Sequence, residues 1–171
     1  MLDFKKVIIE GPDGAGKSTL VNYIIENCGL TNIVHSNNLT KNDFEYHLGL
    51  LTSDNYAVYD RFNLGEIVYP TIFNRKPKMT LAQHKYIFDL AETLNIPYII
   101  FYSSDFDVLK QRLFARGDTD EVLENAEKIN LCFKLLAEQL STKSYKNLHI
   151  IDIAKESDQI EWFKNNVIKG V

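Results

Sequence analysis

The sequence predicts an α/β fold with a five-stranded parallel sheet and helices on both faces. Short apolar runs rich in β-branched and aromatic residues alternate with segments of helical periodicity, and no repeat or linker interrupts the alternation. Strands separated by helices need right-handed crossovers, which make neighbouring strands parallel. A chain of 171 residues with 45% hydrophobic and 25% charged residues is typical of one globular domain, which we expect to span residues 1–171.

Five apolar runs predict the strands. Polar residues, glycine or proline bound them, as in the run that enters through Pro97 and the run that ends at Asp60. The expected strands are 5–10, 32–36, 56–59, 98–102 and 148–153.

Apolar residues spaced three or four apart predict the helices between these strands. Gly29 and Gly117 mark helix ends, Thr80 is an N-cap residue, and Arg75-Lys76-Pro77-Lys78 breaks one helix from the next. The expected helices are 17–28, 42–51, 63–73, 80–94, 105–116, 122–140 and one at the C-terminus.

A phosphate-binding loop pattern joins the first strand to the first helix. It reads Gly-Pro-Asp-Gly-Ala-Gly-Lys-Ser-Thr, and its glycines let successive N–H groups and the helix N-terminus face an anion. Lys17 reaches the β- and γ-phosphates, and the Ser18 hydroxyl ligates Mg²⁺. The pattern predicts a P-loop NTPase fold that binds a nucleoside triphosphate. The residues assigned to the nucleotide are Gly11, Asp13, Gly14, Ala15, Gly16, Lys17, Ser18 and Thr19.

The dipeptide Asp60-Arg61 follows the third strand and is expected at the same sheet edge as the phosphate loop. The Asp60 carboxylate suits Mg²⁺ held with the nucleotide, and the planar fork of Arg61 suits a second phosphate. Taken alone, the pair is more typical of a structural ion pair at the start of a helix. The phosphate loop favours the catalytic interpretation.

Together, residues 11–19 and the Asp60-Arg61-Phe62 motif resemble the thymidylate kinase and deoxynucleoside kinase branch of the P-loop kinases, in its compact virus-encoded form. The resemblance implies ATP as phosphoryl donor, Asp13 at the sugar 3′-hydroxyl of the acceptor, and Tyr69 in the substrate site. It also implies a short mobile lid, about 112–121, that carries Arg112 and Arg116. Lys17, Asp60, Arg61 and these two arginines form the expected catalytic set.

The end of the second strand bears on the acceptor. A nucleoside kinase needs a base to activate a neutral hydroxyl, and relatives use a carboxylate there. Here the strand ends at His35-Ser36-Asn37-Asn38, without Asp or Glu. A monophosphate acceptor is already an anion, so the sequence favours conversion of a deoxynucleoside monophosphate, with dTMP to dTDP as the first choice. A deoxynucleoside kinase with His35 as base, or a non-catalytic nucleotide-binding regulator, are the alternatives.

Composition limits the partners. A net charge of −4 argues against a nucleic-acid surface, and no apolar run predicts a membrane span or a secretory signal. We therefore expect a cytoplasmic protein that binds ATP and a nucleotide or nucleoside; a homodimer stays open. Of the minor features, Tyr46, Tyr69 and Phe73 are candidates for base stacking, and a solvated loop is favoured over substrate contact for Arg75, Lys76 and Lys78.

Overall fold

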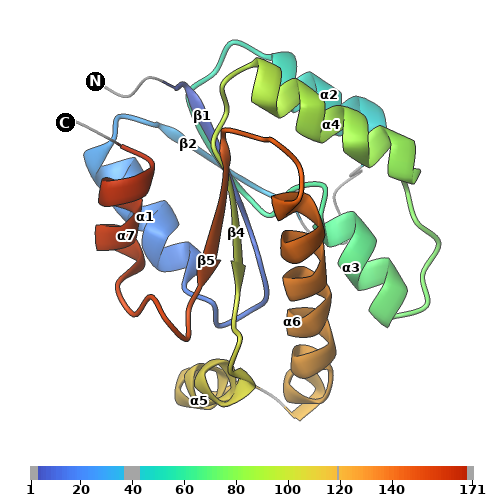
Figure 1. Ribbon diagram of the computed structural model, residues 1–171, viewed down its shortest axis with the longest axis vertical. Helices are drawn as coiled ribbons and strands as arrows, with labels where there is room; N and C mark the ends of the chain where they lie inside the picture. Colours follow the sequence, from blue (N-terminus) through green and yellow to red (C-terminus); the bar gives the residue numbers. More distant parts are fainter. Residues whose placement is uncertain (1–3, 37–42, 119, 169–171) are drawn as a thin grey trace.

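A five-stranded parallel sheet forms the centre of the computed structural model, which describes residues 4–36, 43–118 and 120–168 (Figure 1). The strand order is β2-β3-β1-β4-β5, and every neighbouring pair is parallel. This confirms the predicted α/β fold. The strands are β1 (Lys6–Glu10), β2 (Asn32–His35), β3 (Ala57–Asp60), β4 (Tyr98–Tyr102) and β5 (Leu148–Asp152).

Helices cover both faces of the sheet. In Figure 1, α1 and α7 lie on one side, α2, α3, α4 and α6 lie on the other, and α5 lies beyond the arrowheads of the strands. No helix within the described ranges is long and apolar enough to cross a membrane. The helices are α1 (Lys17–Asn27), α2 (Phe44–Thr52), α3 (Gly65–Ile72), α4 (Leu81–Thr93), α5 (Phe106–Arg116), α6 (Asp120–Ser141) and α7 (Gln159–Asn166).

Alternation along the central strands builds two apolar cores. On β1, Ile8 packs into the core beneath α2, α3, α4 and α6, whereas Val7 and Ile9 pack into the core beneath α1, α5 and α7. A parallel sheet buried on both faces needs such continuous apolar strands. The polar residues that end the strands are therefore the exceptions to be explained.

These polar ends meet at one sheet edge because the strands are parallel and in register. Asp60 pairs with Ile9 of β1 on one side and with His35 of β2 on the other. Glu10, His35 and Asp60 consequently end their strands at the edge that the phosphate loop follows. Ligands of open α/β sheets bind at this edge.

Most helix boundaries fall within two residues of the predicted ones. Thr80 caps α4 through a capping box with Gln83, and Gly117 ends α5 in the left-handed conformation at φ 81°. Two of the sequence-based expectations lie partly outside the described residues: Asn37 and Asn38 after β2, and the segment of the expected lid around Thr119.

Candidate active site

Residues 11–16 form the glycine-rich phosphate-loop motif between β1 and α1. Gly11, Gly14 and Gly16 have φ angles of 145°, 77° and 94°, in the region that favours glycine. A Cβ on Gly11 would also lie 2.7 Å from the Phe101 Cβ, so the loop has no room for a side chain there. The loop lines a cavity of about 400 Å³, together with residues from β2, β3 and α5.

Lys17, the first residue of α1, is held inside this cavity. Only 6% of the residue is exposed, and its ammonium group donates to the Pro12 carbonyl oxygen at 2.7 Å. Burial lowers the pKa of Lys17 to about 8, and the Arg61 charge acts in the same direction, while nearby carboxylates oppose the shift. A cation with so little hydration is well placed to meet a phosphate.

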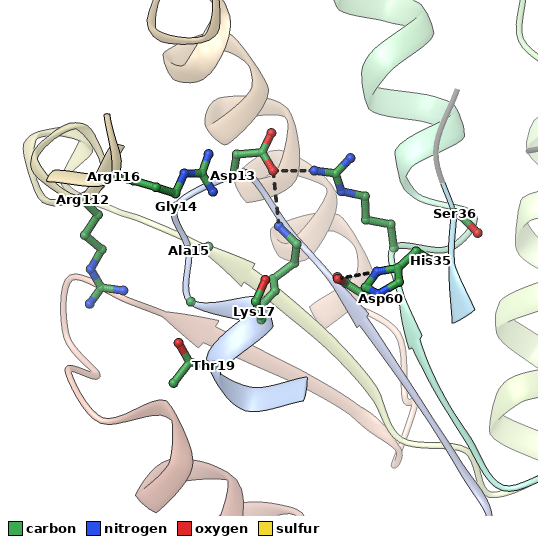
Figure 2. Close-up of a pocket in the computed structure, with 13 residues that line it drawn as sticks. Asp13, Gly14, Ala15, Lys17, Thr19, His35, Ser36, Asp60, Arg112 and Arg116 are labelled. Carbon is green, nitrogen blue, oxygen red and sulfur yellow. Dashed lines mark hydrogen bonds and ion pairs between the residues drawn. The ribbon is translucent and has the colours of Figure 1, made fainter. Parts of the chain in front are cut away.

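Asp13 lies between two cations (Figure 2). Its Oδ1 is 2.5 Å from Nη2 of Arg61 and 3.9 Å from Nζ of Lys17. Burial alone would raise the pKa of Asp13, but the charges of Lys17, Arg61 and Arg116 outweigh it and hold that pKa below its ordinary value. Asp13 is therefore an ionised group that connects the phosphate loop to Arg61.

Arg61 is presented by an unusual backbone conformation. Its φ is +68°, which a residue with a Cβ adopts only when neighbouring contacts hold it. Its N–H donates to the Ile9 carbonyl oxygen at 2.9 Å, and its guanidinium lies 5.8 Å from the ring centroid of Tyr69. The turn after β3 thus aims the guanidinium group at the space beside the phosphate loop.

A second cavity of about 360 Å³ adjoins the first, and Arg61 and Ser36 line both. The rings of Tyr69 and Phe73 stack along it, 6.4 Å apart between centroids. Tyr46 instead packs against His47 and does not line either cavity. Arg75, Lys76 and Lys78 are exposed, as the sequence indicated, yet they also line this second cavity.

Asp60 has one engaged and one unengaged carboxylate oxygen. Its Oδ2 is 3.0 Å from Nδ1 of His35, while its buried Oδ1 has no hydrogen-bond partner within the described ranges. Ser18 lines the same cavity. Hydroxyl and carboxylate oxygens suit Mg²⁺, so these two residues fit an ion that arrives with a nucleotide. Among the residues described, no cluster of three His, Cys, Asp or Glu side chains forms a further metal site.

Arg112 and Arg116, one turn apart on α5, also line the phosphate cavity. Figure 2 shows them on the other side of the phosphate loop from His35 and Asp60. Arg116 donates to both carboxylate oxygens of Asp118, at 2.7 and 2.8 Å. The structure thus brings both arginines to the site, with one already paired to a neighbouring carboxylate.

Three further residues near the loop were not singled out from the sequence. Ser36 is buried, and its N–H donates to the Asp60 carbonyl oxygen at 3.2 Å. Gln159 of α7 is close enough to Gly16 that a Cβ there would lie 2.9 Å from its Oε1. Glu10 is a fully buried carboxylate at the end of a strand whose centre, Val7 to Ile9, is apolar. Of the three, Glu10 had a visible signal, because a charge ends that apolar run.

Solved structures of similar fold include nucleotide complexes. YorR from Bacillus subtilis, in complex with phosphorylated GDP, matches with a TM-score of 0.71 and 24% identity, over 95% of this chain and 93% of its own. Deoxyadenosine kinase from M. mycoides, with the products dCMP and a flexible dCDP, matches at 0.58 and 19%, over 94% and 96%. The same enzyme with dATP matches at 0.56 and 19%, over 94% and 97%.

The sequence comparisons found no match, in contrast to the comparison of structures. No protein-family model matches the chain, and no curated protein sequence matches it. At these identities the structural likeness establishes the P-loop fold, which agrees with the motif and with the sheet.

Proposed function

We propose that this protein transfers the γ-phosphoryl group of ATP to a deoxynucleoside monophosphate, with dTMP as the preferred acceptor. One observation carries the proposal: a second cavity, which is lined by Arg61, Arg75, Lys76 and Lys78, opens beside the phosphate-loop cavity. Two residues that line this second cavity, Ser36 and Tyr69, have buried hydroxyls that lack a hydrogen-bond partner among the described residues.

The distribution of arginine supports anionic ligands on both sides. The chain has four arginines, and each lines at least one of the two cavities. The second cavity adds Lys76 and Lys78 to Arg61 and Arg75. A neutral nucleoside has no charge that could pair with these cationic side chains. A monophosphate has a dianionic group that suits the guanidinium fork.

The chemistry then requires alignment and charge neutralisation. An oxygen of the acceptor phosphate attacks the γ-phosphorus of ATP, and the bond to the β-γ bridging oxygen breaks, which releases ADP. Lys17 and the arginines neutralise the charge on the transferring group, and Asp13 orients Arg61 between the two cavities. Mg²⁺, bound with ATP and near Ser18 and Asp60, supplies further neutralisation.

Two features favour dTMP and ATP in particular. The phosphate loop with its internal Asp13, followed by Asp60-Arg61, resembles thymidylate kinases. The deoxyadenosine kinase of similar fold was solved with dATP and with dCMP and dCDP, so this fold accommodates adenine nucleotides and deoxynucleotides.

A second candidate, a deoxynucleoside kinase, is favoured by one contact. Nδ1 of His35 lies 3.0 Å from Oδ2 of Asp60, and His35 is exposed to the phosphate cavity. A carboxylate that orients an imidazole is a known arrangement for a general base. One of the structures of similar fold is a deoxyadenosine kinase.

A phosphotransfer screen tests the proposal. The purified protein is incubated with ATP, Mg²⁺ and each deoxynucleoside or its monophosphate, and products are separated by anion-exchange chromatography. Formation of dTDP and ADP in equal amounts is expected. ATP hydrolysis alone, or no turnover with any acceptor, would contradict the assignment as a kinase.

Asp13→Ala is expected to raise the KM for dTMP at least tenfold and the KM for ATP less than threefold. Removal of the carboxylate frees Arg61 from its ion pair and removes the group assigned to the sugar hydroxyl. An unpaired buried hydrogen-bonding group costs about 1–3 kcal/mol, which is consistent with that change. Steady-state kinetics with each substrate varied in turn measures it, and 3′-deoxy-dTMP should bind poorly to the wild type. Equal affinity for the two acceptors would count against the role of Asp13.

Arg116→Ala is expected to lower kcat at least tenfold while the KM for ATP changes little. Arg116 is paired with Asp118 and acts on the nucleotide only after it leaves that partner, so its loss affects the transition state more than ATP binding. Lys110→Ala, an exposed position on the same helix, is the matched control. Hydrogen exchange of residues 112–118 should slow when a bisubstrate analogue binds; exchange that is equally slow with and without it would contradict the lid.

A further inference from the structure

Glu10 is a buried carboxylate directly before the phosphate loop. None of its surface is exposed, although it ends a strand whose other residues are mainly apolar. Burial raises the pKa of Glu10 to about 7, while backbone N–H groups of the turn after β3 and the Lys17 charge oppose the shift. A carboxyl group kept in this position must offset its cost of burial by specific contacts.

The contacts of Glu10 connect it to the turn that carries Arg61, the residue proposed to bind the acceptor. Oε1 of Glu10 accepts from the Leu64 N–H at 2.7 Å and lies 3.3 Å from the Tyr98 hydroxyl. The same hydroxyl donates to Oδ1 of Asn63 at 2.8 Å, and the Asn63 amide lies 3.3 Å from Nδ1 of His84. Glu10 therefore belongs to a buried polar network that ties β1 to the residues just before α3.

The turn held by this network is the one that presents Arg61. At its start, the Arg61 N–H donates to the Ile9 carbonyl oxygen; at its end, the Leu64 N–H donates to the Glu10 carboxylate. Consecutive residues of β1 thus hold both ends of residues 61–64. Arg61 needs such support because its φ is +68°, a conformation that is strained for a residue with a Cβ.

We propose that Glu10 is a positioning residue that, through the Leu64 N–H, holds the turn in which Arg61 faces Asp13 and the acceptor. This inference rests on the proposed function for its kinetic consequence. Because Glu10 immediately precedes Gly11, it fixes the acceptor-side guanidinium relative to the phosphate loop. Glu10 itself touches neither substrate.

Three variants separate this role from a general effect on folding. Glu10→Leu removes the hydrogen-bond acceptor, and we expect the KM for dTMP to rise at least tenfold while the KM for ATP changes less than threefold. Glu10→Gln keeps an oxygen for the Leu64 N–H, so its KM for dTMP should stay within threefold of the wild type. Glu10→Asp shortens the side chain by one methylene and should raise the KM for dTMP at least fivefold. If the leucine variant does not fold, the aspartate variant tests the positioning role in its place.

A double-mutant cycle adds a readout that a purely structural role would not produce. In an Arg61→Ala background, Glu10→Asp should change the KM for dTMP less than twofold, because the group that it positions is gone. Equal effects in both backgrounds, an unchanged KM in the Glu10→Asp variant, or no recovery in Glu10→Gln would overturn the inference.

A crystal structure of the Glu10→Asp variant tests the same idea independently of activity. Arg61 should leave the left-handed region and lose its ion pair with Asp13. If Arg61 keeps both, the inference fails even when the enzyme phosphorylates dTMP. If the wild type phosphorylates no monophosphate but Arg61 moves as expected, the proposed function fails and the positioning role stands.

Discussion

Lys17→Ala is expected to lower kcat for phosphotransfer by at least a thousandfold while the protein stays folded. The ammonium belongs to a residue that lines the phosphate-loop cavity and is 6% exposed. In the proposed reaction it neutralises charge on the transferring phosphoryl group. A thousandfold corresponds to about 4 kcal/mol of transition-state stabilisation, a magnitude typical of one preorganised charged donor in a closed site. Single-turnover measurements with saturating ATP and dTMP isolate this effect from binding.

The fold should tolerate the loss of Lys17. Burial lowers the pKa of Lys17 to about 8, so the folded state disfavours its charge and little stability depends on it. The melting temperature of the variant should match or exceed that of the wild type. Lys5→Ala, at an exposed lysine paired with Asp54, is the control for removal of a lysine elsewhere. A folded variant with near wild-type turnover would show that the phosphate loop does not act in catalysis.

Arg61→Lys is expected to lower kcat/KM for dTMP at least a hundredfold although the charge is kept. The guanidinium group meets Asp13 at 2.5 Å while it faces the second cavity, and it lies against the Tyr69 ring. An ammonium cannot bind a carboxylate and two phosphate oxygens in one plane, nor stack on the ring in the same way. A hundredfold corresponds to about 2.7 kcal/mol.

The kinetics of ATP provide the internal control for Arg61→Lys. The KM for ATP should change less than threefold, because the proposed function assigns the donor nucleotide to Lys17 and the loop N–H groups. A lysine variant that keeps wild-type kcat/KM for dTMP would remove Arg61 from acceptor binding. A variant that loses ATP affinity as severely as acceptor affinity would assign Arg61 to the donor side.

Local motifs account for what could be predicted from the sequence. The phosphate loop is a contiguous motif whose glycines allow positive φ angles. Asp60 ends an apolar strand, and the parallel pairing of β3 with β1 brings it to the same sheet edge as the loop. The sheet and its helices follow from periodicity. These features depend on residues close together in the chain.

The second cavity depends on contacts between distant segments, which no local pattern shows. Ser36 reaches it because β2 pairs with β3, which brings residues 36 and 61 to the same place. Only the contact of Arg75 with the Phe73 ring is local. The ion pair between Asp13 and Arg61 joins residues 48 positions apart. Glu10 was visible as a charge at the end of an apolar run, but its hydrogen bond to Leu64 spans 54 positions.

The most direct test of the account is the ratio of kcat/KM for dTMP to kcat/KM for thymidine, measured in one coupled assay with ATP and Mg²⁺. The cationic lining of the second cavity predicts a ratio of at least ten, or about 1.4 kcal/mol in favour of the monophosphate. A ratio below one would contradict the monophosphate assignment, and it would favour the deoxynucleoside kinase in which the pair of His35 and Asp60 activates a hydroxyl.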